Sequence, residues 1–225
     1  MILAGHQPNY LPNTSYFAKM AEADVFVVST ALQLIRDKGW HRRHILPGPA
    51  GDIWLTVPVL GSHRQLIRDT RINNDLPWQA RHRKTIETLY ANRPGVQDLQ
   101  PILALYESGW ERLVDLNWAA ILTIAQILNI TTRVELDESV TGRQADLIIN
   151  TCRHYGANRY LSGIGGREYM DSTYCEKLRS EGIVPIFVRH NLTHDYPYSV
   201  IHYIGFYGSS WVQQLIKKNI QVKSV

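Results

Sequence analysis

The densest group of chemically capable side chains stands near the start of the chain, in the stretch GHQPNYLP at residues 5–12. A histidine can take up a proton near neutral pH, and tyrosine and glutamine can orient a substrate through hydrogen bonds. The two prolines fix φ and lack N–H groups, so they stiffen the loop and hold its side chains in one geometry. We expect His6 and Tyr10 to be catalytic and Gln7 to bind substrate. The alternative is a histidine that only packs against the end of a strand.

A basic and aromatic stretch, LQLIRDKGWHRRHIL, follows at residues 32–46. Arginine side chains bind carboxylates and phosphates through paired hydrogen bonds, and a tryptophan can stack on a ring. A phosphopantetheine arm, a nucleotide or a sugar phosphate would each suit such a stretch, whereas the alternative is a solvated loop. Arg36 and Lys38 add to its positive charge. The residues expected to bind substrate here are Gln33, Trp40, Arg42 and Arg43.

Two further motifs carry candidate residues. In WQARHRKTIETLY, residues 78–90, helical spacing places His82 on one face with Trp78, either as a core histidine or as a second catalytic residue. In YLSGIGGREYMD, residues 160–171, a glycine-rich turn follows Ser162 and Gly163. Backbone N–H groups at such a turn can hold a phosphate or an oxyanion. The turn matches neither the dinucleotide fingerprint, nor the P-loop, nor the nucleophile elbow.

The elements that must position these residues alternate between strand and helix. Residues 1–5 and 24–29 are apolar runs typical of buried strands, and the helical pattern between them begins at Asn13 or Thr14. This order predicts an α/β fold with a mostly parallel, Rossmann-like three-layer sheet, in which the two runs are adjacent central strands. Ligands of such folds bind at the carboxyl ends of the strands. We therefore expect one cleft lined by His6, Tyr10, Arg42 or Arg43, and Ser162.

The rest of the chain continues the alternation. A helical insertion at roughly 76–130 interrupts it, and we expect this insertion to form a subdomain of a single domain over residues 1–225. Thr141 is the expected N-cap of a helix that ends at Gly156. The other expected strands are 52–59, 131–139, 159–163 and 183–190, and the other expected helices are 76–92, 169–182 and an amphipathic tail from 209.

Composition narrows the class of protein. The 225 residues are 44% apolar and 20% charged with a net charge of +4, which is typical of a globular protein and too little charge for a non-specific nucleic-acid binder. The two cysteines fit a reducing cytoplasm, and we expect neither a secretory signal nor a membrane span. His190 and His194 are four residues apart, but a strand end and a turn are expected there, so we expect no metal ligands and no cofactor.

The pattern of motifs resembles the WbqC-like protein family. The matching pieces run in family order over roughly residues 1–190. They are HQPNYLPNTSYFAKMAEADVFV, GWHRRHI followed by WLTVPV, the Trp and His of WQARHRKTIETLY, LN at 116–117, and YLSGIGGREYMD. The chain departs from the family where an acidic stretch usually follows the second strand, since it reads TALQ and keeps only Gln33. It also departs after residue 195.

The resemblance implies a bacterial biosynthetic enzyme that transfers an acyl or aminoacyl group from a carrier-protein or other phosphopantetheine thioester to an amine of a sugar or natural-product intermediate. HQPNYLP would be the active-site loop, with His6 as general base near its ordinary pKa. Lys19 and Tyr169, which belong to the matching motifs, join the expected substrate-binding residues. A nucleotide-using, nucleotidyltransferase-like enzyme and a non-catalytic module for an anionic ligand remain open, and so does a homodimer.

Overall fold

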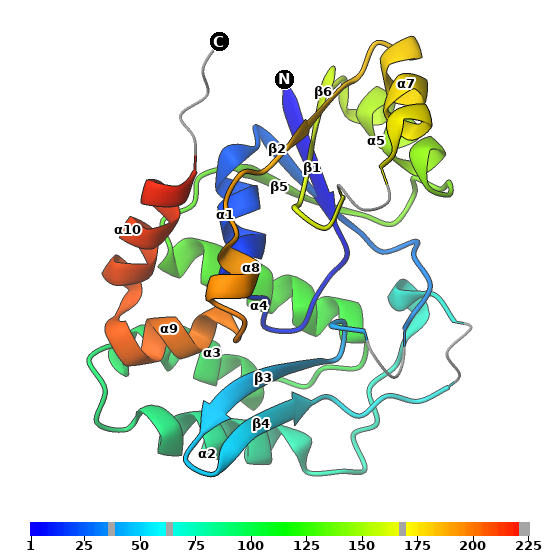
Figure 1. Cartoon of the computed structure of the whole chain (residues 1–225). Helices are drawn as coiled ribbons and strands as arrows, with labels where there is room; N and C mark the ends of the chain where they lie inside the picture. Colours follow the sequence, from blue (N-terminus) through cyan, green and yellow to red (C-terminus); the bar gives the residue numbers. More distant parts are fainter. Residues whose placement is uncertain (36–38, 62–64, 167–169, 221–225) are drawn as a thin grey trace.

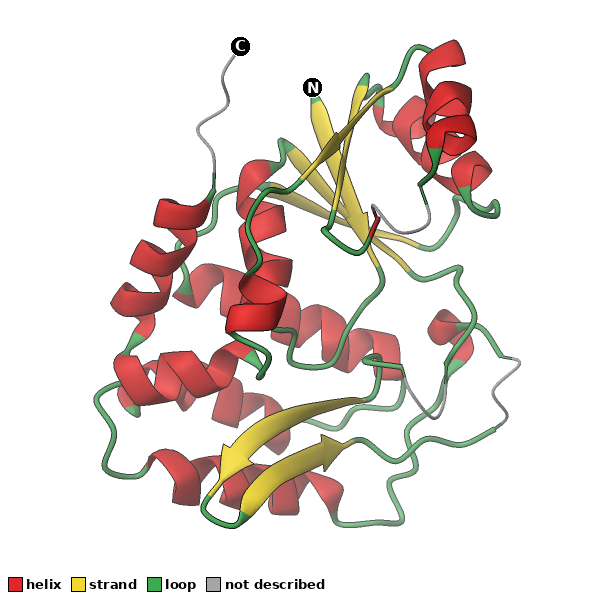
Figure 2. Ribbon diagram, in the orientation of Figure 1, coloured by secondary structure: helices red, strands yellow, loops and turns green. Residues whose placement is uncertain are grey.

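A computed structural model describes residues 1–35, 39–61, 65–166 and 170–220. Its centre is a five-stranded sheet in which every strand pair is parallel, in the order β5-β2-β1-β6-β7 (Figures 1 and 2). Helices cover both faces of the sheet, so the predicted mostly parallel α/β fold is confirmed. The strands are β1 (Ile2–His6), β2 (Val25–Ser29), β5 (Arg133–Asp137), β6 (Arg159–Ser162) and β7 (Val184–Phe187).

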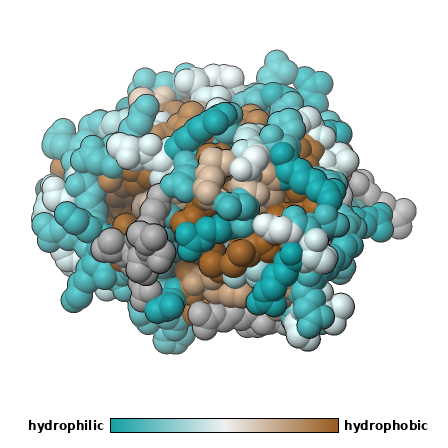
Figure 3. Space-filling model, turned by 90° about the horizontal axis from the view of Figure 1, so that it is seen from above, coloured by the Kyte–Doolittle hydropathy of each residue, from teal (hydrophilic) through white to brown (hydrophobic). Residues whose placement is uncertain are grey.

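The two strands predicted to be central are adjacent and parallel, with Leu3 opposite Val25 and His6 opposite Val28. Their side chains are buried on both faces because helices pack above and below, which explains the unbroken apolar runs in the sequence. Val184 of β7 remains 51% exposed because β7 is an edge strand. Seen from the amino ends of the strands, apolar side chains show in the middle of the face, with hydrophilic ones around them (Figure 3).

Alternate strand residues face two different layers of helices. Ala4, Phe26 and Leu161 belong to the same apolar cluster as α1 (Thr14–Glu22). Leu3, Val27 and Tyr160 pack instead against α5 (Ala145–Tyr155) and α7 (Ser172–Ser180). Asn13 caps α1 by accepting a hydrogen bond from the N–H of Tyr16, as the sequence predicts, and Asp171 caps α7 in the same way. The sheet is therefore the middle of three layers.

The segment predicted to be helical at 76–130 contains α2 (Trp78–Tyr90), α3 (Gln100–Ala104) and α4 (Leu113–Ile127). These helices share the larger apolar cluster with α1, so the core is continuous from the sheet into this segment. Within the described residues, the further helices are α8 (Leu192–Asp195), α9 (Val200–Tyr207) and α10 (Ser209–Asn219), with 3-10 turns at Ile67–Asp69, Gln97–Leu99 and Leu105–Glu107.

The structure places one expected strand outside the central sheet and corrects one expected helix cap. The strand expected at 52–59 is β4 (Gly51–Thr56), and it pairs with β3 (Arg43–Gly48) in a separate antiparallel hairpin beside α2. The basic stretch, for which a solvated loop was the alternative, is thus partly a strand, in which the buried His44 and Leu46 alternate with the less buried Arg43 and Ile45. Helix α5 begins at Ala145 without a side-chain cap, so Thr141 does not cap it, although Gly156 does end it in the left-handed region at φ 68°. None of the described helices is long and apolar enough to cross a membrane.

Candidate functional site

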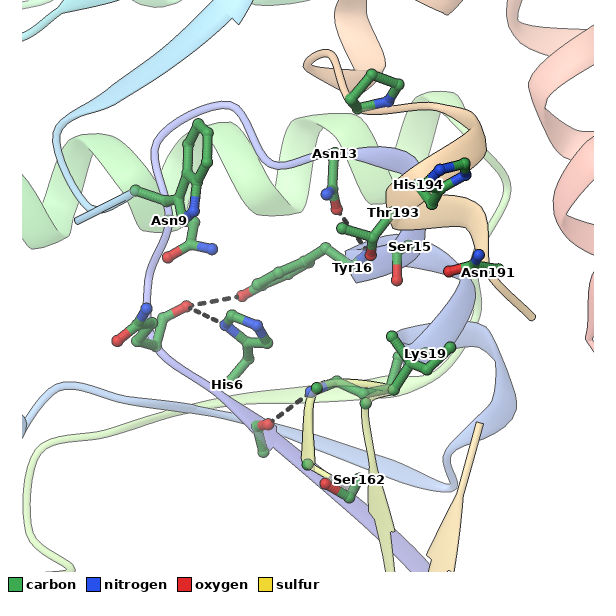
Figure 4. A pocket seen from close by; sticks show the side chains of 18 of the residues that line it. His6, Asn9, Asn13, Ser15, Tyr16, Lys19, Ser162, Asn191, Thr193 and His194 are labelled. Atoms are coloured by element: carbon green, nitrogen blue, oxygen red, sulfur yellow. Dashed lines mark hydrogen bonds between the residues drawn. The ribbon is translucent and has the colours of Figure 1, made fainter. Parts of the chain in front are cut away.

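The candidate site is a cavity of about 780 Å³ at the carboxyl ends of β1 and β6 (Figure 4). The chain leaves β1 toward β2 on one side and later returns to build β6 and β7 on the other, so the strand order reverses between β1 and β6. A crevice opens at such a reversal, and α/β proteins bind their ligands there. Ala4 pairs with Leu161, and the residues just beyond them, Gly5 to Gln7 and Ser162 to Gly163, line the cavity.

The loop after β1 is held rigidly by three other segments. The backbone carbonyl of Trp40 accepts a hydrogen bond from the N–H of Tyr10 at 2.9 Å, and the Ser199 hydroxyl donates to the carbonyl of Leu11 at 2.7 Å. From α4, the Asn117 amide donates to the carbonyls of Pro8 at 2.8 Å and His41 at 2.7 Å. These bonds hold Leu11 in the left-handed region at φ 45°, a costly conformation for a residue with a side chain. The loop is stiff, as its prolines predict, and its contacts stiffen it further.

His6 stands at the centre of the cavity wall. Its ring lies against that of Tyr16, with centroids 4.7 Å apart, and its Nδ1 lies 3.1 Å from the carbonyl oxygen of Gln7. A carbonyl only accepts, so Nδ1 carries the proton and donates, and Nε2 keeps a lone pair. Burial, and then the charge of nearby Lys19, lower the pKa of His6 well below its ordinary value of 6.5. The expectation of a near-ordinary pKa was therefore wrong, and at neutral pH the ring is a neutral acceptor.

Lys19 projects from α1 into the same wall (Figure 4). It is 6% exposed, and its Nζ donates to the carbonyl oxygen of Gly5 at 2.8 Å. Burial lowers the pKa of this amine to about 7, so charged and neutral forms coexist near neutral pH. His190, 5% exposed, has its own pKa lowered by burial and also by the charge of Lys19. The wall beside β1 therefore carries a positive charge when Lys19 is protonated.

Ser162 and the glycine-rich turn close the opposite side. Ser162 is 3% exposed, and the turn is fixed by a hydrogen bond from the N–H of Gly166 to the carbonyl of Gly163 at 2.9 Å. A Cβ added to Gly166 would lie 1.9 Å from the Ser162 hydroxyl oxygen, so this position accommodates only glycine without a shift. The rim carries polar and aromatic side chains, namely Asn9, Asn13, Ser15, Trp40, His44, Asn191, Thr193 and His194.

Several predicted site residues line this cavity, namely His6, Gln7, Lys19, Trp40, Ser162 and Gly163. Tyr10 and His82 do not. Tyr10 is fully buried, and its hydroxyl lies 2.9 Å from His82 Nδ1 and 2.6 Å from the hydroxyl of Tyr106. A backbone hydrogen bond also links His82 to Thr56, so these groups form an internal network that joins the loop to α2. Burial lowers the pKa of His82 to about 4.

The predicted basic residues point elsewhere. Arg42 donates to the carbonyl of Val57 at 3.4 Å, and the guanidinium of Arg43 lies 4.6 Å from the centre of the Trp54 ring, so both are engaged with the hairpin. Gln33 is exposed in an isolated bridge to Leu66 and does not line the cavity. One cleft was predicted to be lined by His6, Tyr10, Arg42 or Arg43, and Ser162, but only His6 and Ser162 line the same cavity. Tyr169, Arg36 and Lys38 lie outside the described residues.

Sequence reasoning missed Asn9, Asn13, Tyr16, His44 and the residues after β7 that line the cavity. One available signal was Asn117, a polar residue within an apolar helical stripe, because a buried amide needs partners and so indicates a contact with backbone. Within the described residues, no group of three or more His, Cys, Asp or Glu side chains could hold a metal ion. The arrangement can accept a proton at His6 and attract an anionic group through Lys19.

Comparison with known proteins identifies the chain's relatives. The family model described as the WbqC-like protein family matches residues 7–204, which include nearly all of the cavity lining. The chain is also 29% identical over 178 residues to the uncharacterized protein Rv1507c of Mycobacterium tuberculosis, covering 76% of each chain. No solved structure matches the chain.

Proposed function

This chain belongs to the WbqC-like protein family, and we propose that it is a biosynthetic transferase that moves a small acyl or aminoacyl group from a thioester to an amine. The observation that carries the proposal is the cavity at the reversal of strand order, where a neutral, half-buried imidazole and a buried amine share one wall. The donor is a phosphopantetheine thioester, free or on a carrier protein, and the acceptor is the amine of a sugar or natural-product intermediate.

The transfer needs a base, because an amine that attacks a carbonyl must lose a proton. The acceptor nitrogen attacks the thioester carbon, the C–N bond forms, the C–S bond breaks, and the thiolate leaves. Nε2 of His6 takes the proton from the nitrogen and returns it to the thiolate, so the products are an amide and a thiol. Nδ1, bonded to the carbonyl of Gln7, fixes the ring for this task.

The cavity supplies groups for the other demands of the reaction. Backbone N–H groups of the turn after Ser162 stabilise the negative charge that develops on the carbonyl oxygen. The ammonium form of Lys19 attracts the anionic part of a substrate, and Trp40 stacks against a flat portion of it at the rim.

A test of the proposal compares His6→Gln with His82→Gln in a transfer assay with acyl-pantetheine thioesters and small amines. Loss of a general base lowers kcat by about 10²–10⁴-fold, so we expect His6→Gln to fall in that range with its fold intact. His82→Gln is the control, because His82 lies in the internal network away from the cavity. A His6→Gln variant that keeps more than about a tenth of the wild-type kcat would remove His6 from the mechanism.

A thermal-shift screen separates the transferase from the other classes. A ligand that binds the folded state raises its melting temperature, by an amount that grows with its concentration relative to Kd. Stabilisation by acyl-pantetheines supports the transferase. Stabilisation by nucleotides alone would favour a nucleotide-using enzyme, and stabilisation by simple anions alone would favour a binding module.

A further inference from the structure

A second, smaller cavity opens on the other side of the end of β1. Its volume is about 220 Å³, and four of its lining residues, Gly5, His6, Gln7 and Tyr160, also line the large cavity. The two cavities thus meet at the residue that the proposed function uses as base. A transferase must hold both a donor and an acceptor at the point of reaction, and the shared wall marks that point.

One face of α5 forms much of the smaller cavity. Leu147, Ile148 and Thr151 follow the 3–4 spacing of a helical face and line the cavity, together with Gln144, which directly precedes the helix. Ile148 is 7% exposed and Thr151 is 4% exposed, and the Thr151 hydroxyl donates to the carbonyl of Leu147 at 2.7 Å. The hydroxyl of Thr151 is therefore engaged in a hydrogen bond within the helix, and its methyl group can contact a ligand.

The rest of the lining is neutral and largely apolar. Leu32 follows β2, and the ring of Tyr174 comes from α7. Ser29 and Gln7 contribute uncharged polar groups. The large cavity differs, because Lys19, whose ammonium form carries a positive charge, lines it. Charge therefore separates the two: the basic cavity suits the anionic part of a substrate, and the smaller one suits an uncharged aliphatic group.

We propose that the smaller cavity holds the hydrocarbon chain of a short, uncharged acyl group while the pantetheine arm and the acceptor lie in the large cavity. The inference rests on the proposed function and deepens it, because it selects an acyl group over an aminoacyl group. The thioester carbonyl then lies between the cavities, beside His6. The acceptor amine reaches it from the large cavity, so the acyl group passes directly to nitrogen and the thiol departs with the proton.

The test measures binding of a chain-length series. The probes are pantetheine, S-butanoyl-, S-hexanoyl- and S-glycyl-pantetheine, and N-methylhexanamide, which carries the chain without the arm. Each methylene that enters an apolar site contributes about 0.8 kcal/mol, or about fourfold in affinity. We expect S-hexanoyl-pantetheine to bind the wild-type protein at least about tenfold more tightly than S-glycyl-pantetheine.

Two substitutions on α5 change the cavity in opposite directions. Thr151→Leu fills it and should weaken S-hexanoyl-pantetheine and N-methylhexanamide about tenfold, whereas Leu147→Ala enlarges it and should strengthen binding of chains longer than hexanoyl. A gain of affinity cannot come from a misfolded variant. Asn150→Leu, exposed on the same helix outside the lining, is the matched control. The affinity for pantetheine itself should stay the same in all three variants.

Each outcome has one meaning. If chain length affects affinity equally in the wild type and in both lining variants, or if S-glycyl-pantetheine binds as tightly as the longer acyl thioesters, the inference is overturned while the thioester donor stands. If neither pantetheine nor its thioesters bind, but N-methylhexanamide shows the expected response to Thr151→Leu, the donor assignment fails and the apolar chain site stands. If no probe binds, both are wrong.

Discussion

Lys19 brings an amine into the wall of the large cavity at the cost of desolvating it. Its pKa of about 7, lowered by burial, means that the ammonium form is lost as the pH rises through neutrality. If the ammonium holds the anionic donor, kcat/KM must fall as the pH rises above about 7. Lys19→Arg should remove this fall, because a guanidinium stays protonated. The measurement is kcat/KM for an acyl-phosphopantetheine between pH 6 and 9.

The same experiment contains its control. Lys217, on α10 away from the cavity, can be changed to Met, and this change should leave the pH profile as it is in the wild type. A wild-type profile that rises through pH 7 would assign Lys19 the opposite task, that of a base in its neutral form. His6 does not produce the alkaline fall, since its pKa lies well below 6.5.

Gly166 shows how a single missing Cβ positions a cavity residue. Gly166→Ala would bring a Cβ to 1.9 Å from the Ser162 hydroxyl, whereas a Cβ on Gly165 meets nothing within 4 Å. Overpacking of this kind costs about 1–3 kcal/mol. We expect Gly166→Ala to lower the free energy of unfolding by that amount and Gly165→Ala to change it little, as measured by urea denaturation. Equal effects would show that Ser162 moves aside freely.

At the scale of elements, α4 holds the loop after β1 and the segment before β3 together through the side chain of Asn117. Asn117 is fully buried, and its amide donates to the carbonyls of Pro8 and His41, one from each segment around the cavity. Asn117→Leu leaves both carbonyls without that donor, and a buried unsatisfied group costs about 1–3 kcal/mol. We expect urea denaturation to register a loss of at least that size. Asn150→Ala removes an exposed side-chain hydrogen bond to Thr141 and should cost far less.

Elements were easier to predict than the directions of their side chains. The apolar runs of β1 and β2 follow directly from burial on both faces, and the cap at Asn13 is a local event, so both could be read from neighbouring residues. The direction of the Tyr10 side chain could not be predicted, because its partners His82 and Tyr106 are 72 and 96 residues away in the chain. The direction of the Arg43 side chain could not be predicted either, since only the pairing of β3 with β4 brings it over Trp54.

At the scale of the whole molecule, one apolar cluster runs from the sheet to α10, and polar networks cross it where segments distant in sequence meet. Several of these buried polar groups are histidines. Burial lowers the pKa of His41, His44, His82 and His202 to about 4, and it also lowers that of His6 and His190. The folded protein therefore holds these rings neutral.

This property predicts a specific sensitivity to acid. An unfolded histidine takes up its proton near pH 6.5, while the folded one stays neutral to lower pH, so between pH 6.5 and about 4 the unfolded state binds more protons. The free energy of unfolding must fall as the pH falls through this window, by up to about 1.4 kcal/mol per pH unit for each such ring.

Urea denaturation at pH 7, 6 and 5 measures this slope of the free energy of unfolding against pH before most carboxylates titrate. His82→Gln should make the slope shallower, and His154→Gln, at an exposed position, should not. A free energy of unfolding that stays constant from pH 7 to 5 would mean that the folded protein admits these protons.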